Sequence, residues 1–181
     1  MFPKLYMYGS AECDQYEIPS GAFISRLPVE LPFSLTNRIT KIVCGGLHTL
    51  ALTDQGQVFS WGCNDDGALG RTGQESVPGL ISLECPVDMI SCGDSHSLAA
   101  NSKNGVIYQW GVYRNTTGGN MGESNRKPVR WGREEFHMKS VEKILSGANH
   151  SLVLAVWKGN ARGNGGRERG TEDGNEGGRE G

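Results

Sequence analysis

The chain lacks the features that would mark a membrane protein or a nucleic-acid-binding protein. It has no run approaching the ~18 consecutive apolar residues of a membrane-spanning helix. Its net charge is only −2 at pH 7, which gives no general reason to expect binding to nucleic acid or to an anionic membrane. No positively charged segment leads into an apolar stretch at the N-terminus, so we expect no secretory signal. These absences favour a reducing compartment, the cytosol or the nucleus.

Cysteine pairs and large apolar content are also missing. The five cysteines are scattered and include no Cys-x-x-Cys pair, which favours reduced thiols that behave as small buried hydrophobic groups over a metal site. Apolar residues make up 36% of the chain, whereas 27 residues are glycine. Nine of those glycines fall in residues 159–181, where no apolar residue is larger than Ala161. Such a segment cannot offset its ordering entropy, so residues 158–181 are predicted to form a disordered tail.

What the chain does contain is a stretch that occurs three times, at residues 42–52, 90–100 and 144–154. Each copy is an apolar run, a glycine turn, a histidine followed by Ser or Thr, and a second apolar run. A second motif, ending in Tyr-Gly or Trp-Gly, keeps step with the first at residues 5–9, 58–62 and 107–111. A fixed period near 50 residues is typical of solenoids and β-propellers.

The segments between these motifs read as short strands and turns. Turn signals recur every 8–12 residues or so, which argues for an all-β fold. No window places apolar residues at helical spacing over ten or more positions. We expect residues 63–70 to be a structural turn, residues 71–86 a crossover, and residues 126–133 a solvated basic loop. Trp61 and Trp110 should lie in the core.

These motifs together resemble the regulator of chromosome condensation family, whose founding member is the nuclear exchange factor for the GTPase Ran. The resemblance rests on Gly-Gly-Leu-His at 45–48, Asn-Asp-Asp-Gly-Ala-Leu-Gly at 64–70 and Gly-Asp-Ser-His at 93–96. It implies a seven-bladed β-propeller with four antiparallel strands per blade.

The repeats at about 5–52, 53–100 and 101–154 would form a partial propeller over residues 1–157. Three blades cannot close such a ring. We therefore expect a fragment or a truncated gene model, rather than a compact three-bladed protein.

The function that the resemblance implies is guanine nucleotide exchange on a Ran-like small GTPase. An exchange factor performs no covalent chemistry, so we expect no enzyme active site, cofactor, metal or small-molecule substrate. It would promote GDP release by inserting acidic and wedge residues near the nucleotide, which is a problem of differential binding. The resemblance also makes histones or chromatin a candidate partner. This candidate is secondary, because the founding member's basic N-terminal tail has no counterpart here. No membrane partner is expected. The alternative is a non-catalytic repeat scaffold for protein–protein interaction.

The resemblance also implies which residues would face the GTPase. Asp94 is the first candidate, and its alternative role is an Asx-turn that holds residues 93–96. His48 matches a position that the family uses, although a turn histidine that bonds backbone groups would look the same. Glu12 falls where the family carries an acid. Asn149 stands where the family has an aspartate before the third histidine, so the charge is lost at that position.

A polar, glycine-rich excursion at residues 113–122 corresponds to a hairpin that, in the family, wedges against the GTPase. The alternative is an ordinary surface loop. Its candidate contact residues are Tyr113, Arg114, Asn115, Thr116, Asn120 and Met121.

Overall fold

The structure, a computed structural model, describes residues 4–11, 16, 21, 24–31, 38–113 and 125–157. The strands are β1 (Tyr6–Ser10), β2 (Ile24–Glu30), β3 (Ile39–Cys44), β4 (His48–Thr53), β5 (Val58–Gly62), β6 (Gly79–Leu80), β7 (Met89–Cys92), β8 (His96–Asn101), β9 (Val106–Gly111), β10 (Asn125–Trp131), β11 (Met138–Ser146) and β12 (Ser151–Trp157). Within the described residues the only helix is α1 (Arg133–Phe136), which is far too short to span a membrane. The prediction of an all-β chain is confirmed.

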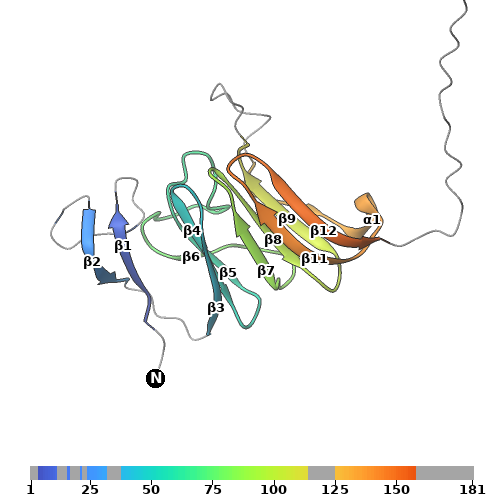
Figure 1. Cartoon of the computed structure of the whole chain (residues 1–181), viewed down its shortest axis with the longest axis horizontal. Coiled ribbons are helices and arrows are strands. Elements are labelled where there is room, and N and C mark those ends of the chain that lie inside the picture. Colours follow the sequence, from blue (N-terminus) through green and yellow to red (C-terminus); the bar gives the residue numbers. More distant parts are fainter. Residues whose placement is uncertain are drawn as a thin grey trace, which may run out of the picture.

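The strands form four antiparallel sheets that follow one another in chain order. Two sheets have four strands each, in the orders β3-β4-β5-β6 and β7-β8-β9-β10. They are flanked by two-stranded sheets, β1-β2 on one side and β11-β12 on the other. Figure 1 shows the four sheets standing side by side from the blue N-terminal pair to the orange C-terminal pair. The described sheets form an incomplete ring, as the sequence predicted.

The second strand of each complete sheet is buried along its whole length apart from the last residue of β8. A sheet with one wet face would alternate apolar and polar residues, whereas a strand covered on both faces reads as a continuous apolar run. Each complete sheet stands between two others, so both of its faces are covered. This explains why the repeated motif continues as Leu-Ala-Leu or Leu-Ala-Ala after its histidine.

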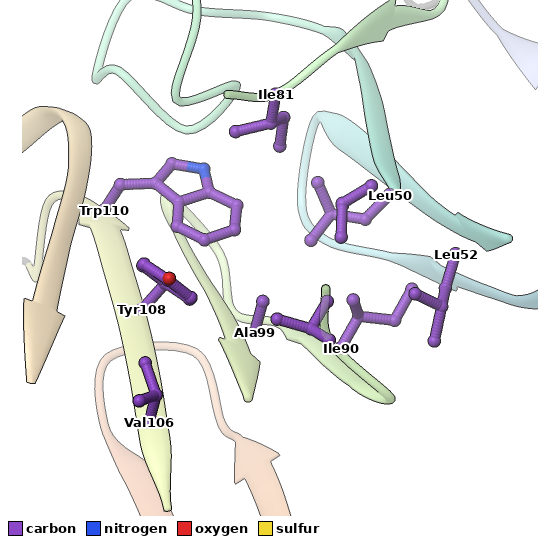
Figure 2. Packing of buried hydrophobic residues seen from close by; sticks show 10 residues of the cluster. Leu50, Leu52, Ile81, Ile90, Ala99, Val106, Tyr108 and Trp110 are labelled. Atoms are coloured by element: carbon purple, nitrogen blue, oxygen red, sulfur yellow. The ribbon is translucent and has the colours of Figure 1, made fainter. Parts of the chain in front are cut away.

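The largest core lies between the two complete sheets, as Figure 2 shows. The first sheet contributes Leu50, Leu52, Val58 and Ile81, and the second contributes Ile90, Ala99, Val106, Tyr108 and Trp110. The same arrangement recurs between the other sheets: Trp61 packs with the β1-β2 side, and Val141 and Ile144 pack on the far face of the second sheet. Burial of Trp61 and Trp110 confirms their predicted place in the core.

Three local expectations were wrong. Residues 126–131, expected to be a basic loop, belong to β10, the fourth strand of its sheet. The strand was missed because edge strands tolerate proline and charge, here Pro128 and its basic neighbours. The expected crossover at 71–86 contains the short strand β6. Cys44 is exposed rather than buried, since the sheet on its side has only two strands.

Several predicted segments lie outside the described residues. They are Glu12, most of the expected wedge, which includes Arg114, Asn115, Thr116, Asn120 and Met121, and the expected disordered tail at 158–181.

Candidate functional site

The three glycine–histidine turns share one geometry. In each turn the glycine amide donates to the carbonyl of the histidine three residues on, at 2.8 Å from Gly45, 2.8 Å from Gly93 and 2.9 Å from Gly147. The imidazole then folds back over that glycine, so that a Cβ at Gly93 would collide with the ring of His96. Glycine is therefore required by the close approach of the ring.

The three turns are also linked to one another across the sheets. The amide of Gly46 donates to the carbonyl of Gly93 at 3.3 Å, and the amide of Asp94 donates to the carbonyl of Ala148 at 3.0 Å. The turns at 45–48, 93–96 and 147–150 therefore form a continuous row along one end of the sheets. We call this surface the turn row.

Asp94 is exposed at the middle of the turn row. Its carboxylate lies over Gly46, where a Cβ would meet Oδ1, so glycine at 46 makes room for the acid of the next repeat. The bonds that hold this turn are made by the backbone: the Gly93 amide donates to the His96 carbonyl, and the Asp94 amide donates to the Ala148 carbonyl. A pocket of about 230 Å³ opens beside it, and Asp65 and Asp66 are also among its lining residues.

His48 lies beneath this pocket and is buried. Its Nε2 is 2.8 Å from Ser97 Oγ, and Ser97 in turn donates to the carbonyl of Ala68 at 2.9 Å. Because the serine proton is used on Ala68, Nε2 of His48 is assigned as the donor to Ser97 Oγ. Burial and then the nearby His96 lower the pKa of His48 to about 4. The alternative role for His48 was a turn histidine that bonds backbone groups. The imidazole instead bonds a side chain of the next sheet, Ser97.

His96 repeats this arrangement one sheet further on. Its Nε2 lies 3.0 Å from Ser151 Oγ, and Tyr113 both stacks on the imidazole at 4.0 Å and reaches Ser151 at 2.9 Å. The Nδ1 of His96 is buried without a hydrogen-bond partner. Burial, followed by the charge of His150, lowers the pKa of His96 to about 4. Tyr113, predicted as a wedge residue, is half-buried in this contact.

The two contacts define a rule for the repeat: each histidine bonds the serine that follows the histidine of the next sheet. This contact accounts for the serine that follows the histidine in the second and third copies of the motif, Ser97 and Ser151. The third turn departs from the pattern, because no further sheet follows it among the described residues. His150 and Asn149 are both exposed at that end of the turn row.

Two arginines hold the first sheet's loop, a role that the sequence did not predict for either. Arg71 donates to the carbonyls of Ser60, Gln74 and Val77 at 2.7–3.0 Å. Arg126 donates from β10 to the carbonyls of Asn64 and Asp65 at 3.4 and 2.8 Å. Neither has a signature in the sequence, because the partners are backbone carbonyls. The loop that carries Asp65 is thereby anchored to the next sheet.

The turn row presents charged and hydrogen-bonding side chains. Residues 38–113 and 125–157 bring together no group of three or more metal-ligating side chains. The buried histidines His48 and His96 point into the contacts between sheets, and the exposed groups of the turn row include the Asp94 carboxylate, the Asn149 amide, His150 and the apolar Leu47.

The comparisons with known proteins agree with the geometry. Two family models described as the regulator of chromosome condensation repeat match residues 55–100 and 39–68. The regulator of chromosome condensation of Mus musculus is 33% identical over 151 residues, which cover 81% of this chain and 35% of that protein. The Drosophila melanogaster protein of the same name is 41% identical over 117 residues, 62% of this chain and 21% of its own length.

The chain is also similar to part of a protein with a different name, a ubiquitin ligase. The human E3 ubiquitin-protein ligase HERC2 is 34% identical over 125 residues, which cover 65% of this chain and 2% of the ligase. Among solved structures, Prp20p of Saccharomyces cerevisiae, described with its binding properties to Gsp1p and histones, has a TM-score of 0.71 at 20% identity. The match covers 87% of this chain and 40% of the Prp20p chain. Human WBSCR16 has a TM-score of 0.67 at 26% identity, and the match covers 85% of this chain and 40% of the WBSCR16 chain.

The fold and the turn row define the class: the described sheets are blades of a β-propeller repeat protein. Each complete sheet is one four-stranded blade, and the glycine–histidine turn of each repeat lies at one end of its blade. The chain belongs to the regulator of chromosome condensation repeat family. It spans between 21% and 35% of the length of the four curated relatives of that name.

Proposed function

We propose that this chain recognises a Ran-like small GTPase through the turn row and promotes release of its bound nucleotide. The observation that carries the proposal is Asp94, an exposed carboxylate beside a pocket at the middle of the row. The turn geometry does not require an acid there, since the equivalent positions are Gly46 and Ala148. An acid in this place is available to pair with the lysines that hold phosphates or to disturb the Mg²⁺ site of a GTPase.

The arrangement suits differential binding. Backbone bonds between neighbouring turns hold Asp94 in place before any partner arrives, so little ordering is required when the partner binds. A carboxylate that is better paired in the nucleotide-free GTPase than in the GDP-bound form lowers the barrier to release, as in any catalysis by differential binding. No bond is made or broken in this process. The partner and the nuclear location follow from the family resemblance.

The test is the rate of fluorescent GDP release from a purified Ran-like GTPase in the presence of the chain. Asp94→Asn should slow the accelerated release about tenfold or more, the effect of losing one charged contact worth over 1.4 kcal/mol. The matched control is Asp54→Asn, which removes another exposed acid at the opposite end of β4 and should leave the rate unchanged. Equal rates for the two variants would remove Asp94 from the mechanism.

A second candidate function is a binding scaffold without exchange activity. The observation that favours it is Asn149, an uncharged residue on the turn row where the resemblance calls for an aspartate. The match to a ubiquitin ligase also indicates that these repeats occur in proteins with other activities. A scaffold would bind the GTPase with the same affinity whether or not GDP is present. An exchange factor must bind the nucleotide-free form more tightly.

A further inference from the structure

The pocket beside Asp94 is built by two blades rather than one. Asp94 comes from the glycine–histidine turn of the second blade, whereas a loop of the first blade, residues 63–70, supplies several of the other lining residues. They are Cys63, Asp65, Asp66 and Ala68. The 63–70 loop connects β5 to the segment that contains β6. The place of this pocket wall relative to Asp94 therefore depends on how the 63–70 loop is held against the second blade.

The two ends of the 63–70 loop are held by its own blade. The Asn64 amide group donates to the carbonyl of Arg71 at 3.1 Å, and its Oδ1 accepts from the amide of Leu69 at 3.0 Å. Ser60 Oγ donates to the carbonyl of Leu69 at 2.8 Å. These bonds fix the points where the loop leaves β5 and where it continues towards β6.

The middle of the loop is held by the second blade. The carbonyl of Ala68 accepts from Trp110 Nε1 at 2.7 Å and from Ser97 Oγ at 2.9 Å. The carbonyl of Asp65 accepts from Nη2 of Arg126, on β10, at 2.8 Å. Trp110 and Ser97 are fully buried, whereas Arg126 is exposed. Arg126 is therefore the one of these three donors whose loss leaves the core between the blades intact.

An irregularity in β10 brings Arg126 to the loop. The register advances four positions on β10, from 125 to 129, while it advances two on β9, from 111 to 109. Bulges of this kind redirect side chains and are common beside functional sites. The displaced segment approaches the loop so closely that a Cβ at Gly67 would lie 2.8 Å from the Cα of Arg126. Gly67 also has a φ of 76°, so glycine is required there on both counts.

We propose that Arg126 is a positioning residue for the pocket beside Asp94, and that the 63–70 loop it holds is a second part of the partner-binding surface. This inference rests on the proposed function. The exposed carboxylate of Asp65 then meets the same basic partner as Asp94. Arg126 acts through the loop, and a guanidinium suits this task because its planar fork reaches two carbonyls, those of Asn64 at 3.4 Å and Asp65 at 2.8 Å.

The proposal divides the effects on exchange between two residues. Asp94 is held by its own backbone bond to Ala148, so loss of Arg126 leaves it in place. Arg126→Gln should therefore raise the GTPase concentration that gives half-maximal GDP release about tenfold and leave the maximal rate within about twofold. Asp94→Asn should lower the maximal rate instead. General destabilisation would reduce the amount of active chain without changing the half-maximal concentration.

Hydrogen exchange in the full chain without a partner measures the positioning directly. The amides of Gly67 and Leu69 are both bonded to Asn64 within the loop, so they report whether the loop keeps its shape. Arg126→Gln should speed their exchange about tenfold. Arg126→Lys keeps the charge but lacks the fork, so its exchange and half-maximal concentration should fall between those of Arg126→Gln and the wild type. The matched control is Arg130→Gln, which removes an exposed arginine of the same strand that pairs with Glu84 at 3.2 Å.

Two results would overturn the proposal. One is loop exchange in Arg126→Gln that equals the exchange in Arg130→Gln. The other is faster loop exchange with an unchanged half-maximal concentration, which would leave Arg126 a structural role alone. A wild-type chain that does not accelerate release refutes the proposed function and the recognition role with it, whereas exchange of the loop in the free chain still decides whether Arg126 holds the pocket wall.

Discussion

The two buried histidines should make the stability of this propeller fall in mildly acidic solution. His48 and His96 both have a pKa of about 4 in the folded chain, against an ordinary value near 6.5. Protonation of His96 would place an N–H at the buried Nδ1, which has no acceptor, and His48 already donates from Nε2 to Ser97. The unfolded chain therefore binds protons between pH 6.5 and 4 that the folded chain does not.

The sign and size follow from proton linkage. Because folding lowers these pKa values, the stabilisation is fully present above pH 6.5 and is lost as the pH falls towards 4. Each histidine loses about 2 kcal/mol of unfolding free energy between pH 7.5 and 5, so the pair loses about 4 kcal/mol. That is a large share of the total for a domain whose stability is typically about 5–15 kcal/mol.

The assay is urea unfolding followed by tryptophan fluorescence at a fixed protein concentration, from pH 7.5 to pH 5. The double variant His48→Gln/His96→Gln retains an amide donor at each site but cannot titrate, so its unfolding free energy should change much less over this range. His137→Gln is the control, because His137 is exposed and lies at the other end of β11 from the turn row, away from both buried imidazoles. A flat wild-type profile, or a double variant with the wild-type slope, would refute the reasoning.

Two further predictions concern the turn row. Gly93→Ala should destabilise the chain by about 3 kcal/mol in urea unfolding, because the new Cβ collides with the ring of His96, which Ser151 and Tyr113 hold in place. The same change at Gly147 should reduce stability far less, since His150 is exposed and free to rotate; equal losses would contradict this account. Asn149→Asp should increase the rate of GDP release from a Ran-like GTPase several-fold by restoring a charge on the turn row. An unchanged rate, with Asn149→Ala equally inert, would instead favour the scaffold function.

The repeat made the architecture predictable from the sequence. Three copies of the glycine–histidine turn, together with the Trp-Gly strand, mark the inner three strands of each blade. The fourth strand was not predictable, because β6 has only two residues in register and β10 carries proline and basic residues. The fourth strands lie at the outer edge of the blades, where packing requirements on the sequence are weakest.

The candidate site was predictable only in part. The sequence indicated Asp94 and His48, and the structure places both beside one pocket. It gave no sign that His48 bonds Ser97 in the next blade, since the two residues lie 49 positions apart and only the packing of blades brings them together. The roles of Arg71 and Arg126 were missed because their partners are backbone carbonyls, which leave no mark on the sequence.

The most direct test of the central claim, that the turn row serves nucleotide exchange, is GDP release from a Ran-like GTPase with the unmodified chain. Circular dichroism should first establish that the purified chain has the β structure described here. The proposal predicts that the folded chain accelerates release in proportion to its concentration. A folded chain that binds the GTPase without accelerating release, or does not bind it at all, would contradict the claim.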